Sequence, residues 1–171
     1  MYGNYRANKD GVENSTDRSN ELIIASLLEH LWQCKMEKQP KFSTFDFMAL
    51  KGDVGSFKDR QIKAFVEIRC LNNRLKQYPY IFINLKKLIE ARMIEATTDT
   101  ACLYVVQFID VLAYCRLNKK LALIKGCHGW KRRTGPNDND ELGLIPIKEF
   151  KIITDQATDG VVHQTSTQAR Q

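Results

Sequence analysis

Hydrophobic positions in the first third of the chain recur at helical spacing. Ser19 or Asn20 can cap a helix here, and Glu21 then falls in its first turn, where negative charge suits the helix dipole. The pattern predicts a helix that runs to about Lys35, before a loop that Pro40 marks. Its wide apolar face consists of Leu22, Ile23, Ile24, Leu27, Leu28, Leu31 and Trp32.

Two strands are expected after this helix, over residues 41–50 and 61–71. In the first, Phe45, Phe47 and Ala49 lie on one side and Asp46 is among the others. Side chains of a strand alternate between its two faces. In the second strand, one face is therefore wholly apolar and the other carries charge. The apolar face is Ile62, Ala64, Val66, Ile68 and Cys70, and the charged face is Lys63, Phe65, Glu67 and Arg69.

The rest of the chain predicts a second helix and further strands. The helix spans residues 84–96, and strands follow at 101–109 and 111–116, with 121–124 as a possible extension of the sheet. A long loop covers residues 126–142, and two short apolar segments close the domain. The residues expected to point inward from the second helix are Leu85, Leu88, Ile89, Met93 and Ile94.

This order of elements indicates an α/β domain, a mixed β-sheet flanked by helices. We expect a single domain over residues 19–157, because this length suits one hydrophobic core. Residues 1–18 and 158–171 are polar, and we expect a flexible N-terminal arm and a flexible C-terminal tail.

The main feature of the composition is an excess of basic over acidic residues. The net charge is +6 and the isoelectric point is near 9.1, which suits a polyanionic partner such as nucleic acid. No apolar run is long enough to span a membrane, and the N-terminus has no apolar stretch typical of a secretory signal. Five cysteines form no CxxC pair, which argues against zinc and favours a reducing, cytoplasmic setting.

The strand pair brings candidate chemistry together. Asp46 lies on one expected strand and Glu67 on the next, with Arg69 facing the same way as Glu67. Magnesium prefers oxygen ligands, usually one or two carboxylates with waters and phosphate oxygens. Such an ion polarises a phosphoryl group and helps to generate a hydroxide nucleophile, while a nearby cation stabilises developing negative charge.

Asp46 and the segment Glu67-Ile68-Arg69 resemble the Asp…(Asp/Glu)-x-Lys motif of the PD-(D/E)XK nuclease superfamily, in particular its small phage-encoded members. The resemblance implies a restriction-endonuclease-like core of the α-β-β-β-α-β type and phosphodiester hydrolysis that depends on Mg²⁺, or Mn²⁺, held by Asp46 and Glu67. A glutamate of the first helix often contributes in that family, and the candidate is Glu21, with Glu29 as the alternative.

Two basic positions depart from the pattern. Arg69 replaces the motif lysine, and an arginine cannot accept a proton. Leu71 stands where the phage proteins tend to carry an arginine, for which Arg74 can substitute. Lys86 or Lys87, on the second helix, can reach in from another element. These departures keep open a degenerate site that binds without cutting.

The resemblance and the basic balance together predict a nuclease of phage or mobile-element recombination, repair or processing, acting on DNA in preference to RNA in the host cytoplasm. The alternative is a catalytically degenerate binding module, for nucleic acid or for a protein, which includes a virion-associated role; a third reading is a structural protein whose likeness is accidental. A homo-oligomer or a phage protein partner is also open. The expected phosphate contacts are Lys63, Arg74, Lys86, Lys131, Arg132 and Arg133.

Overall fold

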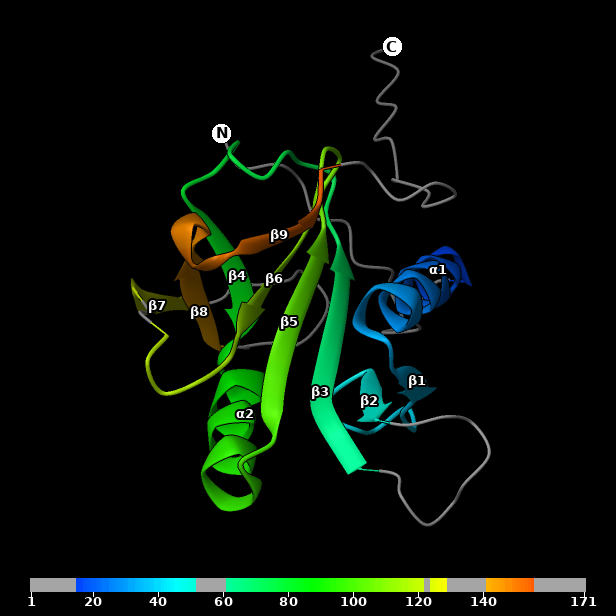
Figure 1. Cartoon of the computed structure of the whole chain (residues 1–171). Helices are drawn as coiled ribbons and strands as arrows, with labels where there is room; N and C mark the ends of the chain where they lie inside the picture. Colours follow the sequence, from blue (N-terminus) through cyan, green and yellow to red (C-terminus); the bar gives the residue numbers. More distant parts are fainter. Residues whose placement is uncertain (1–14, 52–60, 122–123, 129–140, 156–171) are drawn as a thin grey trace.

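The computed structural model describes residues 15–51, 61–121, 124–128 and 141–155 (Figure 1). Within them, the strands form a six-stranded sheet in the order β1-β2-β3-β5-β6-β9 and a three-stranded sheet in the order β4-β8-β7. The elements are α1 (Ser15–Trp32), β1 (Lys35–Lys38), β2 (Phe47–Lys51), β3 (Gln61–Cys70), β4 (Tyr80–Asn84), α2 (Leu85–Thr98), β5 (Ala101–Gln107), β6 (Leu112–Arg116), β7 (Ile124–His128), β8 (Glu141–Pro146), a 3₁₀ turn (Ile147–Glu149) and β9 (Lys151–Thr154).

The larger sheet is mixed. β3 and β5 pair in parallel, whereas the β1/β2, β2/β3, β5/β6 and β6/β9 pairs are antiparallel. A parallel pair needs a crossover connection, which β4 and α2 supply. In Figure 1, α1 lies on one side of β3 and β5 and α2 lies on the other. The expected fold class, a mixed sheet flanked by helices, is confirmed.

The two faces of the sheet bury separate cores. Val66 and Ile68 of β3 pack with α1, through Ile24 and Leu28 among others. Phe65, from the opposite face of β3, packs against the core that contains residues of α2. The alternation expected along β3 therefore places Glu67 on the α2 side of the sheet, next to Lys87, whereas the long side chain of Lys63 reaches the end of α1.

The first helix differs from the sequence prediction. It begins at Ser15, so neither Ser19 nor Asn20 caps it, and Glu21 lies beyond the first turn. Asn20 and Glu21 are both buried. The capping rule chose the wrong polar residues because both lie inside the helix, where Ser19 is exposed and Asn20 is buried. The helix also takes in residues 15–18, which were expected to belong to the arm.

Three further predictions need correction. The first expected strand starts only at Phe47, so Asp46 lies in the preceding loop, and β1 occupies residues expected near the helix end. Ile89 and Met93 of α2 are exposed, since Leu88 and Ala91 are the residues buried in the core. β4 was not expected, and β7 pairs with β8 in the smaller sheet instead of extending the larger one.

Among the described residues, neither helix is long and apolar enough to cross a membrane.

Candidate active site

Glu67 is the most deeply buried charged residue in the part of the chain that the structure describes. It lies in the middle of β3, paired in register with Tyr104 of the parallel neighbour β5, and its side chain is 1% exposed. Burial raises the pKa of this carboxyl above its ordinary value, and the negative charge of Asp46 adds to the rise, although Arg69 and Lys87 oppose it. A carboxyl in such a place is a candidate for function.

Two cations hold the Glu67 carboxylate from different elements. The Lys87 ammonium, on α2, donates a hydrogen bond to Oε2. Nη2 of Arg69, on β3, lies 2.9 Å from Oε1. Within the described residues, however, Oε1 accepts no hydrogen bond, because the guanidinium is close without being aligned for one. One oxygen is thus satisfied by Lys87, and the other is buried with only an ion pair.

Asp46 is fixed to the backbone beside Glu67. Its Oδ2 accepts a hydrogen bond of 3.0 Å from the backbone N–H of Ile68. The neighbouring Phe45 and Phe47 are buried in the α2-side and α1-side cores respectively. Phe45 and Phe47 are thus anchored on opposite faces of the sheet, and Asp46, between them in the chain, is held against β3.

Glu21 approaches Asp46 through a shared lysine. Nζ of Lys38 lies 2.5 Å from Oε2 of Glu21 and 4.0 Å from Oδ1 of Asp46, and it also sits 4.7 Å from the centre of the Phe47 ring. Glu29, the alternative helix acid, is engaged elsewhere: it forms an ion pair of 2.8 Å with Lys35 and accepts the N–H of Met36. Of the two candidates, Glu21 is the one that lies near Asp46.

Arg69 lies within electrostatic range of all three acids. Burial alone would lower the pKa of its guanidinium, but Glu67, Tyr104, Asp46 and Glu21 raise it, and the net pKa is above the ordinary value. Arg69 therefore stays protonated, and about half of its side chain is exposed to solvent. We define the acidic group as Glu21, Asp46 and Glu67, and the cation group as Lys38, Arg69 and Lys87.

A comparison with family models assigns the chain to a family. The model of the family described as "Phage putative PDDEXK endonuclease" matches residues 7–153 of the chain. The chain belongs to this family. The search of solved structures also found Archaeoglobus fulgidus Hjc, a Holliday junction resolvase from an archaeal hyperthermophile, with 8% identity and a TM-score of 0.47, over 79% of this chain and 92% of that one. A search of curated proteins gave no match.

The described residues of this PD-(D/E)XK endonuclease family member contain no group of three histidine, cysteine, aspartate or glutamate side chains placed to hold a metal ion. A hard divalent cation can take fewer protein ligands. Two carboxylates, Asp46 and Glu67, can serve, since Mg²⁺ commonly takes one or two and completes its shell with water and phosphate oxygens. The buried Oε1 of Glu67 accepts no hydrogen bond in the described structure but lies 2.9 Å from Nη2 of Arg69, so it could ligate such an ion only once Arg69 moves away.

The residues expected to contact phosphate are spread over the molecule. Lys63 Nζ lies 3.3 Å from the carbonyl of Gln33 and 3.5 Å from that of Trp32, so it binds the end of α1. Arg74 is exposed in the turn after β3. Lys86 is exposed on α2, 3.8 Å from Glu90. Residues 131–133 lie outside the described part of the chain.

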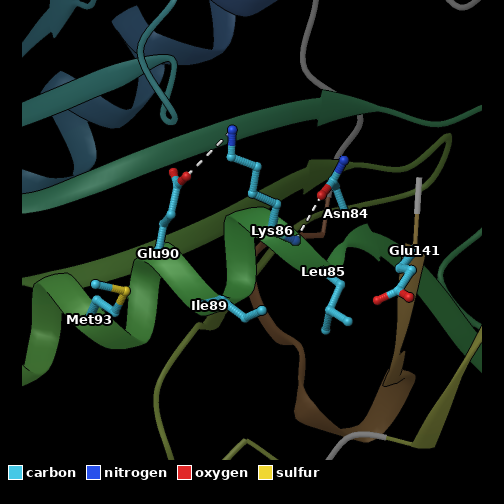
Figure 2. Close-up of a pocket in the computed structure, with 7 residues that line it drawn as sticks. All are labelled: Asn84, Leu85, Lys86, Ile89, Glu90, Met93 and Glu141. Atoms are coloured by element: carbon cyan, nitrogen blue, oxygen red, sulfur yellow. Dashed lines mark hydrogen bonds and ion pairs between the residues drawn. The ribbon is translucent and has the colours of Figure 1, made fainter. Parts of the chain in front are cut away.

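Lys86 borders a shallow pocket of about 400 Å³ on the outer side of α2 (Figure 2). Leu85, Ile89 and Met93 supply its apolar lining, and Glu141 closes it from β8. No member of the acidic group lines this pocket, so it is separate from the candidate active site.

Of the lysines at the site, Lys87 was expected only as an alternative to Lys86, and Lys38 was not expected there. The contact of Lys87 with Glu67 was only one of two possibilities, beside Lys86. The buried positions of α2 decide between them, since Leu88 and Ala91 face the sheet and carry Lys87 inward with them. Lys38 belongs to β1, a strand that the sequence pattern did not indicate.

Proposed function

We propose that this PD-(D/E)XK family member is a divalent-metal-dependent nuclease that hydrolyses phosphodiester bonds in DNA, within phage or mobile-element recombination, repair or processing. The observation that carries the proposal is the buried Oε1 of Glu67, which accepts no hydrogen bond from the described residues, next to Asp46. A buried polar atom without a hydrogen bond is costly to stability and is retained where it serves another purpose.

Asp46 and Glu67 would hold Mg²⁺ or Mn²⁺. When bound, the ion polarises the scissile phosphate and lowers the pKa of a water nucleophile. Asp46 is preorganised for this by the hydrogen bond from Ile68, and Glu67 by Lys87.

Arg69 can change partner when a substrate binds. Its side chain is half exposed and faces Glu67 without a hydrogen bond to Oε1. A phosphate oxygen offers the guanidinium a better-aligned acceptor. If Arg69 turns to the phosphate, it neutralises developing charge there and leaves Glu67 Oε1 open to the cation. Lys87, which is less exposed and hydrogen-bonded, stays on Oε2.

The test is cleavage of supercoiled, branched and single-stranded DNA with Mg²⁺ or Mn²⁺. Asp46→Asn and Glu67→Gln should each lower the cleavage rate at least about 100-fold, as expected when a main charge-stabilising group is lost. Glu95→Gln is the matched control, because Glu95 is also paired with an arginine, Arg116, but away from the acidic group. It should leave the rate unchanged.

A second readout does not depend on turnover. Mn²⁺ at about 100 times its dissociation constant should stabilise the wild-type fold by about 2.7 kcal/mol, and it should not stabilise Asp46→Asn. Absence of both cleavage and metal stabilisation would refute the metal-dependent proposal.

One observation favours the alternative of a binding module. Both Glu67 oxygens already face a cation, Lys87 on one side and Arg69 on the other. This neutralises the carboxylate without a metal. DNA affinity that falls steeply with salt, with no cleavage of any substrate, would support that alternative.

A further inference from the structure

The loop that carries Asp46 also carries the most exposed large hydrophobic side chain of the described structure. Phe42 is 97% exposed, whereas the others in that class range from 36% to 62%. It lies in a turn closed by a hydrogen bond of 2.9 Å from the N–H of Ser43 to the carbonyl of Pro40. Such turns favour polar residues or glycine. Burial of a phenylalanine side chain would contribute about 1.5–3 kcal/mol to stability, and the exposed ring of Phe42 does not make that contribution.

The base of the same loop is anchored. The N–H of Gln39 bonds to the carbonyl of Asp46 at 2.8 Å. The hydroxyl of Thr44 donates to Glu90 of α2, and Phe45 is buried against Phe65 at 5.9 Å between ring centres. These contacts anchor the loop and determine where its tip lies. Phe42 is therefore exposed on an anchored loop.

The tip is basic and close to the acidic group. Lys41 is exposed beside Phe42, whereas Lys38, at the start of the loop, is paired with Glu21 and Asp46. Asp46 lies four positions after Phe42, which is at most about 14 Å of extended chain. At about 3.4 Å per nucleotide along a strand, that length of chain corresponds to about four nucleotides, so Phe42 lies on the scale of a few nucleotides from the acidic group.

Phenylalanine has an apolar face and no hydrogen-bonding group, so it recognises the π-face of a base and not its edge. In an intact duplex those faces are covered by neighbouring bases. Unpaired or unstacked bases expose them, and an aromatic side chain stacks on them or wedges between them. Lysine charge beside the ring attracts the adjoining phosphates.

We propose that Phe42 stacks on an unpaired base next to the cleavage position, so that the chain selects DNA with locally disrupted pairing. This inference rests on the proposed function, and it adds the class of substrate. A protein surface as the occupant of Phe42 is the competing outcome.

The test measures binding in EDTA, where no cleavage occurs, to a 30-bp duplex and to the same duplex with a four-nucleotide mismatched bubble. The bubble carries 2-aminopurine, whose fluorescence reports stacking. Wild type should prefer the bubble and change the fluorescence. Phe42→Ala should lower the ratio of bubble to duplex affinity about 5- to 150-fold, equivalent to the 1–3 kcal/mol of one base–aromatic stack. Phe42→Trp should keep the ratio and the fluorescence change.

Ile152→Ala is the matched control, because Ile152 is an exposed hydrophobic residue on β9, at the opposite edge of the sheet from β1. It should behave as wild type. If Phe42→Ala keeps the wild-type ratio and fluorescence, the stacking proposal is wrong. In that case, cleavage by wild type in Mg²⁺ would leave the proposed nuclease function standing. Wild-type protein that neither binds nor cuts either DNA would overturn both.

Discussion

Replacement of Lys87 by methionine removes the ammonium that donates to Glu67 and keeps a flexible side chain of similar length. Loss of one partner of a buried ion pair costs about 3–5 kcal/mol, and a hydrogen bond to a charged group contributes about 1.5–3 kcal/mol. Lys87 is one-quarter exposed, and Arg69 still faces the other oxygen of Glu67, so the cost falls toward the lower range. We expect Lys87→Met to lower the free energy of unfolding by about 2 kcal/mol at neutral pH.

Urea unfolding followed by circular dichroism measures this cost, and the melting temperature should fall by about 4–8 °C in a chain of this size. The same change in a Glu67→Gln background should cost less than about 1 kcal/mol, because the buried charge is gone. Lys86→Met is the matched control: Lys86 is 82% exposed and its ion pair with Glu90 is long, at 3.8 Å, so its loss should cost no more than about 0.5 kcal/mol.

The pH dependence gives an independent check. Burial raises the pKa of Glu67 above 4.5, so this group contributes stability below pH 4.5 that is lost as the pH rises through its folded pKa. Lys87 lowers that pKa, so Lys87→Met should raise it further. The gap in stability between wild type and variant should therefore widen as the pH rises above 4.5. An equal cost in both backgrounds, or a cost independent of pH, would refute the ion-pair reasoning.

Three other expectations concern the fold around the site. Asn84 caps α2 through a hydrogen bond to the N–H of Lys86, and Asn84→Ala should cost about 1 kcal/mol in urea unfolding. Ala91 is fully buried, so Ala91→Leu should cost about 1–3 kcal/mol by overpacking, whereas the exposed Ala96→Leu should change stability by less than about 0.5 kcal/mol. The pKa of Glu29 is lowered despite some desolvation, through Lys35 and the Met36 N–H; the stability that Glu29→Gln removes above pH 4.5 should vanish on acidification, and unfolding curves that stay apart there would contradict it.

The alternation along β3 was readable because it depends on local geometry. Period-two patterning predicted that Glu67 and Arg69 face the opposite side of the sheet from Val66 and Ile68. The structure agrees, because Val66 and Ile68 lie in the core on the α1 side and Phe65, from the other face, packs against the second core. The same pattern is also typical of a half-solvated sheet, where charge on one face is ordinary. Whether a charged face of this kind is exposed or buried depends on which elements pack over it. In this protein, α2 and its neighbours cover Glu67. That cover comes from residues about twenty positions away in the chain.

Errors in the sequence prediction arose where tertiary packing overrode local preference. Asn20 has the chemistry of a helix cap, yet it is buried inside α1. Ile89 and Met93 fit an apolar helical face, yet the small Ala91 is what lies against the sheet, since it permits close approach of the helix. β1 has a charged sequence, KMEK, and is held by pairing with β2 and by the bond from Met36 to Glu29.

The basic position of the motif shows why local spacing understates this site. In the sequence of β3, Arg69 occupies the position of the lysine in Glu-x-Lys. In the structure, an ammonium nevertheless contacts Glu67, because Lys87 donates to it from α2, the helix of the β3–β5 crossover. Arginine and lysine are not interchangeable, because the guanidinium stays charged and suits a phosphate, whereas an ammonium is a compact charge whose pKa shifts when buried. With the ammonium supplied by α2, the phosphate contact that we propose for Arg69 would not leave Glu67 without a cation. The substitution then fits a division of roles in which the strand carries the arginine and the helix carries the ammonium that pairs with Glu67. The double-mutant cycle of Lys87→Met and Glu67→Gln measures the second of these roles.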